Sequence, residues 1–337
     1  MSRPHILVTG GAGYIGSHAV LALLDAGYPV IVLDNLITGF DWAVDPRATL
    51  IVGDIADSGM VAEVLHAHDI QAIMHFAGSI LVAESVADPL KYYRNNTAAS
   101  ASLVETALKA GIRHLLFSST AATYGQPPVS PIPETAPTVP INPYGRSKLM
   151  TEQMLADAAR AHPLNHCALR YFNVAGADPH GRSGQSSAVA THLIKIAAEA
   201  AIGLRDQIAV FGSDYPTADG TCVRDYIHVS DLASAHLHAL ERLMAVPDEN
   251  LVLNCGYGRG FSVLEVLDAV DRVTGRAIPR VMADRRPGDP PELVADNRAI
   301  LSTLPWRPAH DDLEAIIADA IAWETRLAAR RAGRAAA

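Results

Sequence analysis

The chain has 337 residues, of which 49% are hydrophobic and 19% charged, and this composition excludes a disordered protein. Its formal net charge is −9 and its Lys and Arg are scattered, so we expect neither a nucleic acid nor an anionic membrane as a partner. No apolar run reaches the length of about 18 residues that a membrane-spanning helix needs. The opening MSRPHILVTGG lacks the features of a signal peptide. We expect one large domain or two intimate ones.

Short runs of Val, Ile and Leu alternate with longer helical patterns in the first half of the chain. The runs that predict strands are residues 5–9, 29–34, 50–55, 70–78, 113–119 and 166–172. A helix is expected between the first two runs, ending at about Ala26. This alternation is typical of βα units, so the predicted fold class is α/β, with a doubly wound parallel Rossmann sheet buried on both faces.

The pattern weakens after about residue 175, where Gly and Pro interrupt the sequence. Strand-like runs at 207–212 and 251–254, and helical patterns at 262–275 and 312–327, predict a smaller C-terminal α/β region. We therefore expect a cofactor-binding Rossmann domain at 1–175 and a region at 176–337 that mainly binds substrate. The boundary is approximate, and the chain is expected to cross between the two.

Cysteine and histidine give no sign of a disulfide framework or a metal site. The chain has three widely spaced cysteines, Cys167, Cys222 and Cys255. Their odd number and spacing fit neither a disulfide framework nor a zinc ribbon, which indicates a reducing cytoplasm. Asp178, His180 and His192 lie in loop-like sequence without two-turn helical spacing, so they are expected to be satisfied or solvated rather than metal ligands.

A glycine-rich segment, TGGAGYIGSH, follows the first predicted strand directly. Gly10, Gly13 and Gly16 form G-x-x-G-x-x-G, which allows a tight turn and lets backbone N–H groups at a helix N-terminus approach a pyrophosphate. Asp34 stands eighteen residues after Gly16, at the end of the second predicted strand, where a carboxylate would bind the adenosine ribose. Asp34 would repel a 2′-phosphate and DNLITGF has no Arg to receive one, so the sequence predicts NAD rather than NADP. A glycine-rich turn with an incidental Asp is the alternative.

The stretch INPYGRSKLM contains a Tyr and a Lys one helical turn apart. Pro143 at a helix start would place Tyr144 and Lys148 on one face. A phenol needs a pKa shift of roughly three units, or about 4 kcal/mol, to act as a base near neutrality. A neighbouring ammonium and a positive nicotinamide carry charges of the right sign. By spacing alone, a surface helix with a chance Tyr and Lys remains an alternative.

Three further segments follow the third, fourth and fifth predicted strands: residues 53–55, 75–78 and 117–125. The carboxyl ends of parallel strands form one edge, where open α/β folds bind ligands. Together with the Tyr/Lys pair, these segments resemble the extended short-chain dehydrogenase/reductase superfamily over nearly the whole chain.

Within that superfamily the chain is most similar to the UDP-glucose 4-epimerases. The segments that carry this resemblance are GGAGYIGSH, LDN at 33–35, YYRNN at 92–96, YGRSK, RYFN at 170–173, DYPTADGTCVRDYIHVSDLA at 214–233 and RRPGD at 285–289. The resemblance implies that NAD oxidises C4 of a UDP-hexose, the 4-keto sugar turns over, and hydride returns to its other face. It also implies a homodimer formed by helices near 89–110 and 144–161, whose apolar faces could instead be buried within one monomer.

The resemblance implies three groups of site residues. The catalytic residues would be Tyr144, Lys148 and Thr120, with Thr120 hydrogen-bonding the sugar O4. The NAD-binding residues would be Gly10, Gly13, Tyr14, Ile15, Gly16, Asp34, Asn35, Asp54, Ile55, Phe76, Ala77, Gly78, Asn95, Tyr144, Lys148 and Phe172. The substrate-binding residues would be Thr120, Asn173, His192, Leu193, Phe211, Arg224, Tyr226, Val263, Arg286, Asp289 and Leu293. The alternative roles are an ion pair with Asp225 for Arg224 and a solvated loop charge for Arg286.

Two positions depart from the pattern of the relatives. Ile80 stands where many have a Lys that reaches the cofactor. Leu293 stands where some have a bulkier Tyr at the wall of the hexose pocket, so activity on UDP-N-acetylglucosamine is also expected.

Three other functions are alternatives. A nucleotide-sugar 4,6-dehydratase typically has Asp-Glu where this chain has Ala121 and Ala122. A UDP-pentose or UDP-uronate 4-epimerase remains open. An NAD-sensing module generally has no need of the Tyr/Lys pair.

Overall fold

A seven-stranded parallel sheet forms the centre of the molecule. The computed structural model describes residues 3–187, 191–286 and 288–335. The strands of the sheet are, in spatial order, β11 (Leu251–Cys255), β6 (Asn165–Tyr171), β5 (His114–Ser118), β4 (Ile70–His75), β1 (His5–Thr9), β2 (Val30–Asp34) and β3 (Thr49–Val52). Every neighbouring pair is parallel, which confirms the predicted fold class.

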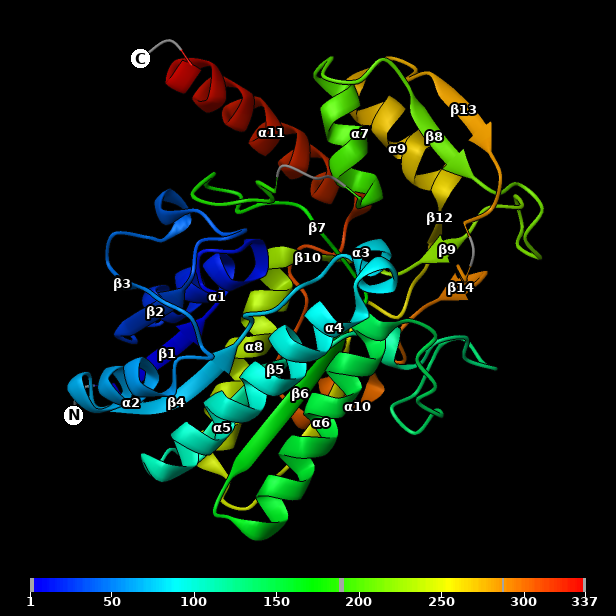
Figure 1. The fold of residues 1–337 in the computed structure, drawn as a ribbon. Helices are drawn as coiled ribbons and strands as arrows, with labels where there is room; N and C mark the ends of the chain where they lie inside the picture. Colours follow the sequence, from blue (N-terminus) through cyan, green and yellow to red (C-terminus); the bar gives the residue numbers. More distant parts are fainter. Residues whose placement is uncertain (1–2, 188–190, 287, 336–337) are drawn as a thin grey trace.

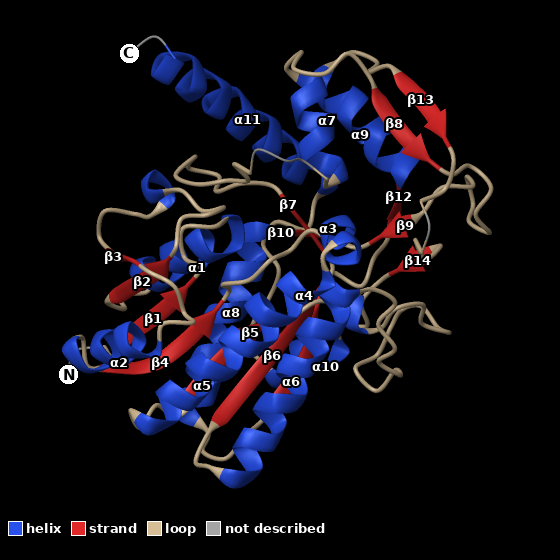
Figure 2. Ribbon diagram, viewed as in Figure 1, coloured by secondary structure: helices blue, strands red, loops and turns tan. Residues whose placement is uncertain are grey.

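Helices cover both faces of this sheet, as Figure 2 shows. One face carries α1 (Tyr14–Asp25), α8 (Val229–Ala245) and α10 (Arg298–Thr303), and the other carries α2 (Ser58–Ala67), α5 (Ala99–Lys109) and α6 (Pro143–Ala161). In β1, Ile6 and Val8 pack in the core on the side of α1, α8 and α10, and Leu7 packs in the core on the side of α2, α5 and α6. Successive side chains of a strand point to opposite faces of the sheet. Burial on both faces explains why the strands are continuous apolar runs.

The strand order reverses between β1 and β4. From β1 the chain builds outward through β2 to β3, and from β4 through β5 and β6 to β11. At such a reversal the connections leave in opposite directions and open a crevice outside the carboxyl ends of the strands. The glycine-rich segment after β1 and residues 76–78 after β4 therefore meet at this crevice.

A smaller region stands beyond the carboxyl edge of the sheet (Figure 1). Its helices are α7 (Leu193–Ala201), α9 (Val263–Thr274) and α11 (Leu313–Ala335), which share one apolar core. Its short strands pair as β8 (Ile208–Phe211) with β13 (Arg280–Ala283), β7 (Asn173–Ala175) with β10 (Tyr226–His228), and β9 (Val223–Arg224) with both β12 (Phe261–Ser262) and β14 (Glu292–Leu293). The helices predicted at 262–275 and 312–327 are confirmed.

One strand lies elsewhere than the sequence predicts. The sequence predicts the run at 251–254 as part of the smaller region, but β11 pairs with β6 at the edge of the main sheet, with Leu253 opposite Leu169. The chain returns because α8 packs against α1 on the main sheet, and a helix followed by a parallel strand is the ordinary way to extend such a sheet. Residues 229–255 therefore belong physically to the Rossmann sheet.

The helix expected near 89–110 consists of three pieces. A short α4 (Pro89–Tyr92) leads into a π-helical stretch, η2 (Tyr93–Ala98), and then into α5. Asn96 in the π-helical stretch accepts a hydrogen bond from Ser79 N at 2.7 Å through its side chain, and its carbonyl accepts one from Ser100 Oγ. Wider turns of this kind are frequent at functional sites.

The remaining elements are short: η1 (Asp41–Ala43), α3 (Val82–Ala87) and η3 (Ala121–Thr123). Among the described residues, no helix combines the length and apolar character needed to cross a membrane. The last helix, α11, reaches back to the loop after β2, where Trp323 stacks on Trp42 with ring centroids 6.3 Å apart. The smaller region is thus tied to the Rossmann sheet by packing as well as by the chain.

Candidate active site

The glycine-rich turn between β1 and α1 forms a cradle that larger residues would fill. Gly10 has a φ of +73°, and a Cβ added to it would lie 2.6 Å from Ala77 N. A Cβ on Gly16 would lie 2.2 Å from Gly10 O. Only glycine fits such positions. The turn opens onto the N-terminus of α1, whose first N–H groups and dipole favour an anion, so this cradle fits a pyrophosphate.

Three polar residues meet at the carboxyl ends of β2 and β3. Asp34 accepts hydrogen bonds from Ala12 N at 2.9 Å and from Leu36 N at 2.8 Å, one on each carboxylate oxygen. Asn35 Nδ2 donates to Asp54 Oδ2 at 2.9 Å. Each oxygen of a carboxylate has two lone pairs, so Asp34 is fixed by the glycine-rich turn and retains acceptor capacity for ribose hydroxyls.

The segment after β4 contacts both the cradle and the π-helical stretch. Gly78 lies close to Asn96, since a Cβ on Gly78 would be 3.0 Å from its Oδ1. Asn95 Nδ2 donates to Ser79 Oγ at 2.9 Å. Ile80, where the resemblance implies a Lys in many relatives, is 55% exposed. An Ile at this place supplies no ammonium to a cofactor.

Tyr144 and Lys148 extend from the first two turns of α6. This helix begins as predicted, with Pro143 in its first turn and the Asn142 side chain accepting from Gly145 N at 2.8 Å. Tyr144 is 9% exposed and Lys148 3%. Lys148 Nζ donates to the carbonyl of Ser118 at 3.0 Å and lies 4.9 Å from the centroid of the Phe117 ring. The pair is therefore buried at the carboxyl end of β5 and is not a chance pair on a surface helix.

The Thr120 side chain lies beside the Tyr144 hydroxyl and lowers the pKa of that phenol. Its Oγ1 accepts from Ala122 N at 3.1 Å, so the hydroxyl proton of Thr120 is free to be donated to the phenol oxygen. A donor to that oxygen favours the phenolate. The structure therefore brings together Tyr144, Lys148 and Thr120, which the sequence separates by up to 28 positions.

The pKa of Tyr144 departs from the expected direction. Burial raises it above the ordinary value, and the Thr120 side chain only partly opposes this. Lys148 was expected to lower it, but the ammonium is turned toward the Ser118 carbonyl and loss of water is the larger effect. Burial also lowers the pKa of Lys148 to about 8, against the opposing charge of Glu152, so Lys148 is mainly protonated at neutral pH.

Three of the predicted substrate-binding residues, Arg224, Asp289 and Leu293, lie together at β9 and β14. Leu293 pairs with Arg224 across the two strands, and Arg224 NH2 lies 3.9 Å from Asp289 Oδ1. Leu293 and Phe172 pack on the same small apolar cluster, which includes Tyr124. A guanidinium, a carboxylate and an apolar wall thus lie close together, which suits a diphosphate and a sugar.

The alternative ion pair of Arg224 with Asp225 is wrong. Asp225 is fully buried, and its carboxylate accepts from Tyr257 N, Gly258 N and Ala295 N at 2.9 to 3.3 Å. The Arg224 guanidinium instead donates to Val223 O at 2.8 Å. Arg224 is therefore not neutralised by its neighbour in the sequence.

A second guanidinium comes from the loop after β13. Arg286 is exposed and stacks on Phe211, with Cζ 3.9 Å from the ring centroid, so this charge of the loop has a defined aromatic partner. Pro287, which follows it in the RRPGD segment, lies outside the described residues.

The other predicted substrate residues differ in exposure, from the buried Tyr226 to the exposed His192. Tyr226 is 3% exposed and packs in the core formed by α7, α9 and α11, and Leu193 and Val263 are half-buried against that core. Asn173 N donates to Asp225 O at 3.0 Å. His192 shares a hydrogen bond of 2.8 Å with the Gln185 amide. The Tyr226 ring therefore packs inside the protein.

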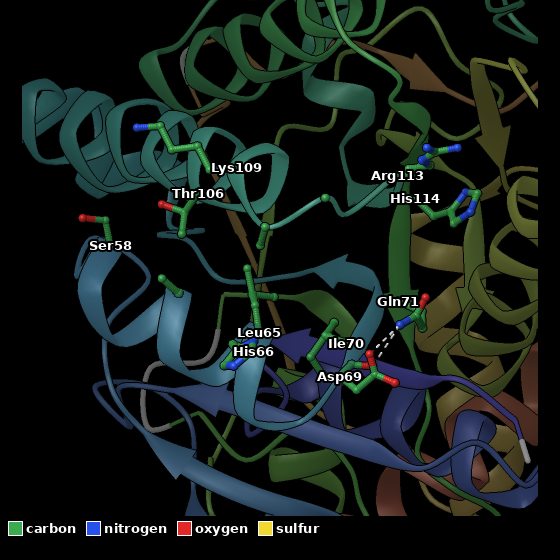
Figure 3. A pocket seen from close by; sticks show the side chains of 13 residues that line it. Ser58, Leu65, His66, Asp69, Ile70, Gln71, Thr106, Lys109, Arg113 and His114 are labelled. Carbon is green, nitrogen blue, oxygen red and sulfur yellow. Dashed lines mark hydrogen bonds between the residues drawn. The ribbon is translucent and has the colours of Figure 1, made fainter.

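A hollow of about 620 Å³ lies away from all these residues. Figure 3 shows it between α2 and α5, beside the amino ends of β4 and β5, where Ile70 and His114 begin their strands. Its lining is polar and mixed in charge, with Asp69 hydrogen-bonded to Gln71. The carboxyl ends of the strands, where the glycine cradle and the Tyr/Lys pair meet, are at the opposite edge of the sheet.

The chain is similar over most of its length to proteins of known function. The model of the NAD dependent epimerase/dehydratase family matches residues 6–256. The chain belongs to this family. It is 56% identical to a UDP-glucose 4-epimerase of Azospirillum brasilense, over 97% of this chain and 93% of that protein.

Two solved structures of family members are also closely similar. The UDP-glucose 4-epimerase from Brucella ovis in complex with NAD has a TM-score of 0.92 and 46% identity, covering 95% of this chain and 98% of that one. The UDP-Glc/GlcNAc 4-epimerase from Campylobacter jejuni has a TM-score of 0.84 and 47% identity, covering 96% and 99%. Membership of this NAD-dependent family confirms the prediction, made from Asp34, that the cofactor is NAD.

Sequence reasoning missed the polar residues that hold the turn at residues 118–120, at the end of β5, against α6. Ser118 and Ser119 stand in the FSST segment at the end of β5, and Arg170 begins the RYFN segment. The resemblance implies roles for Thr120, Phe172 and Asn173 of these segments, but none for Ser118, Ser119 or Arg170. Glu152 follows Lys148 by one further helical turn. That third residue at a spacing of four was a signal available in the sequence.

Proposed function

We propose that this protein interconverts UDP-glucose and UDP-galactose, using NAD that it retains through the cycle. The observation that carries this is the meeting of the glycine cradle, Asp34 and the buried Tyr144–Lys148–Thr120 cluster at one edge of the sheet, in a chain 56% identical to a UDP-glucose 4-epimerase. When bound, NAD supplies an acceptor and then a donor of hydride at the sugar C4.

The side chains around that edge have distinct tasks. Tyr144 removes the proton from O4 as C4 is oxidised and returns it on reduction, while Thr120 hydrogen-bonds the same oxygen. Lys148, protonated below its pKa of about 8, holds the nicotinamide ribose. Arg224 and Arg286 bind the diphosphate, so the sugar itself can remain loosely held and turn over.

The two parts of the chain divide the ligands between them. Residues 1–175 hold NAD, and 176–337 mainly hold the UDP-sugar, with α8 and β11 of the latter range completing the sheet. The three cysteines are free and buried, which supports a reducing compartment, the cytoplasm, as the place of action.

Incubation of the purified protein with UDP-galactose and no added cofactor tests this function. We expect UDP-glucose to form until the two sugars reach equilibrium, because the cofactor is regenerated in each cycle. Denaturation of the same preparation should release NAD, since the Asp34 carboxylate repels a 2′-phosphate. Failure to form UDP-glucose even with added NAD, or release of stoichiometric NADP, would overturn the proposal.

A 4,6-dehydratase is not favoured at this site. Ala121 and Ala122 form the short η3 turn after Thr120, and neither methyl group can act as the acid or base that elimination of water requires. The product separation in the same incubation would reveal a dehydrated 4-keto sugar directly.

We expect a homodimer formed by α5 and α6. Met150 on α6 is 43% exposed, and Leu90 of the neighbouring α4 is 62% exposed, so apolar side chains remain at this surface after the monomer has folded. Their burial in a partner would be favourable. Light scattering at micromolar concentration should give twice the mass of the 35.8 kDa chain, and a monomer would contradict the expectation.

Leu293 should allow an N-acetylated sugar to bind. A Tyr at this wall would project a ring and hydroxyl toward the C2 substituent, whereas Leu leaves room for an acetamido group. Pocket shape rejects an oversized substrate more firmly than a smaller one, so Leu mainly adds activity. We expect turnover of both UDP-N-acetylglucosamine and UDP-glucose, and Leu293→Tyr should lower the rate on the former alone. An unchanged ratio of the two rates would exclude Leu293 as the gate.

A further inference from the structure

Three consecutive residues at the end of β5, Ser118 to Thr120, each lie against a different residue of α6. The carbonyl of Ser118 accepts from Lys148 Nζ, Ser119 Oγ donates to Glu152 Oε1, and the Thr120 side chain lies beside the Tyr144 hydroxyl. The three helix residues are spaced four apart, so they form one stripe over two turns of the same face. Two hydrogen bonds thus fasten residues 118–120 to the helix, and only the bond from Lys148 belongs to the Tyr/Lys pair.

The Glu152 carboxylate, which accepts from Ser119, is the most firmly held of these groups. Glu152 is 5% exposed, and Arg170 of β6 grips it with two nitrogens, Nε to Oε1 at 3.0 Å and NH2 to Oε2 at 2.5 Å. The opposite side of the guanidinium donates to Tyr124 OH at 3.0 Å, and that hydroxyl donates to Asn254 Oδ1 at 2.7 Å. The network centred on Glu152 therefore links α6, the turn after β5, and the strands β6 and β11.

Such an arrangement needs an explanation beyond stability. A buried ion pair is often no more stabilising than apolar residues of the same volume, because both charges lose their hydration. A polar network whose members are all satisfied does, however, fix geometry. Catalysis is sensitive to that geometry, since small displacements of a reacting group cost large factors in rate.

We propose that Glu152 is a positioning residue for the epimerisation: through Ser119 it fixes the turn that carries Thr120, and one helical turn after Lys148 it places a carboxylate charge on the same face of α6. This inference rests on the catalytic roles proposed above for Tyr144, Lys148 and Thr120. Neither Glu152 nor Ser119 contacts a reacting atom.

The charges around Lys148 support the second part. Burial lowers the pKa of Lys148 and Glu152 opposes that effect. The other titratable groups beside it are His75 on β4, whose pKa burial lowers to about 3, and Tyr144 one helical turn earlier, whose pKa burial raises, so both are neutral near pH 7. Without the Glu152 carboxylate, neither group would oppose the effect of burial on Lys148.

Ser119→Ala and Glu152→Gln separate the two effects. Ser119→Ala breaks the tie to the turn but leaves the ion pair, so kcat should fall about tenfold with little change in KM, and both limbs of the pH profile should stay in place. Glu152→Gln removes the charge, so the basic limb of kcat/KM should move to lower pH by about one unit. Glu152→Asp keeps the charge on a shorter arm and should behave as Ser119→Ala does.

The matched control is Thr151→Val. Thr151 precedes Glu152 and is fully buried, and its hydroxyl donates to Asn96 O and Ser147 O. This variant should lower stability without moving the pH profile or kcat by more than about twofold.

Two results would overturn the inference: Ser119→Ala within twofold of the wild-type kcat, or a basic limb that stays in place in Glu152→Gln. If Glu152→Gln fails to fold, Ser119→Ala and Glu152→Asp still decide the positioning role. If Tyr144→Phe remains active, the proposed catalytic base is wrong; if that variant is inactive and the profiles above do not change, only the role of Glu152 is wrong.

Discussion

Tyr144→Phe should lower turnover at least about a hundredfold, the scale of general base catalysis, while the protein folds and keeps its NAD. The ring is buried and packs edge-to-face against Tyr92, with centroids 6.4 Å apart, and Phe preserves that packing. Only the transferable proton is lost. Steady-state rates on UDP-galactose and the NAD content of the denatured protein measure the two outcomes.

The neighbouring Tyr92 supplies the matched control. Its hydroxyl donates to Leu81 O at 2.6 Å and to Glu84 Oε2 at 2.8 Å, so Tyr92→Phe removes a buried hydroxyl from the same pair of rings without touching the proposed base. We expect its turnover to stay within a few-fold of wild type. Activity of that order in Tyr144→Phe would rule out Tyr144 as the base.

Arg170→Met should destabilise the protein by about 3–5 kcal/mol, because it leaves the Glu152 carboxylate buried without its partner. The two side chains are 7% and 5% exposed, so water cannot replace the guanidinium. Urea unfolding at pH 7 measures the loss as a lower midpoint.

The double variant Glu152→Leu/Arg170→Met tests the cause. Replacing both charges by apolar groups removes the desolvation cost together with the attraction, so most of the stability should return even though catalysis does not. The surface pair Arg160–Asp157, with side chains 76% and 75% exposed, gives a comparison: Arg160→Met should hardly change the midpoint. A loss below about 1 kcal/mol in Arg170→Met would show that the buried pair is not essential to the fold.

The sequence by itself determined the features that depend on neighbours along the chain. Runs such as Ile6–Val8 are apolar on both faces of the strand, which is possible only in a sheet covered on both sides. Gly10 and Gly16 could be assigned to a cradle because a tight turn into a helix needs residues without Cβ. Asn142, Pro143, Tyr144 and Lys148 define a helix start and one of its faces through spacing alone.

The tertiary structure alone decided the features that depend on distant residues. Leu253 pairs with Leu169, 84 positions earlier, and the apolar pattern of β11 is the same whichever sheet it joins. The direction of the Tyr144 pKa shift depends on how completely packing removes water, and Tyr226 proved to be buried for the same reason. Ser119, Glu152 and Arg170 come from a turn, a helix and a strand. Their types and local spacing are compatible with three separate surface roles, and only close packing turns them into one buried network.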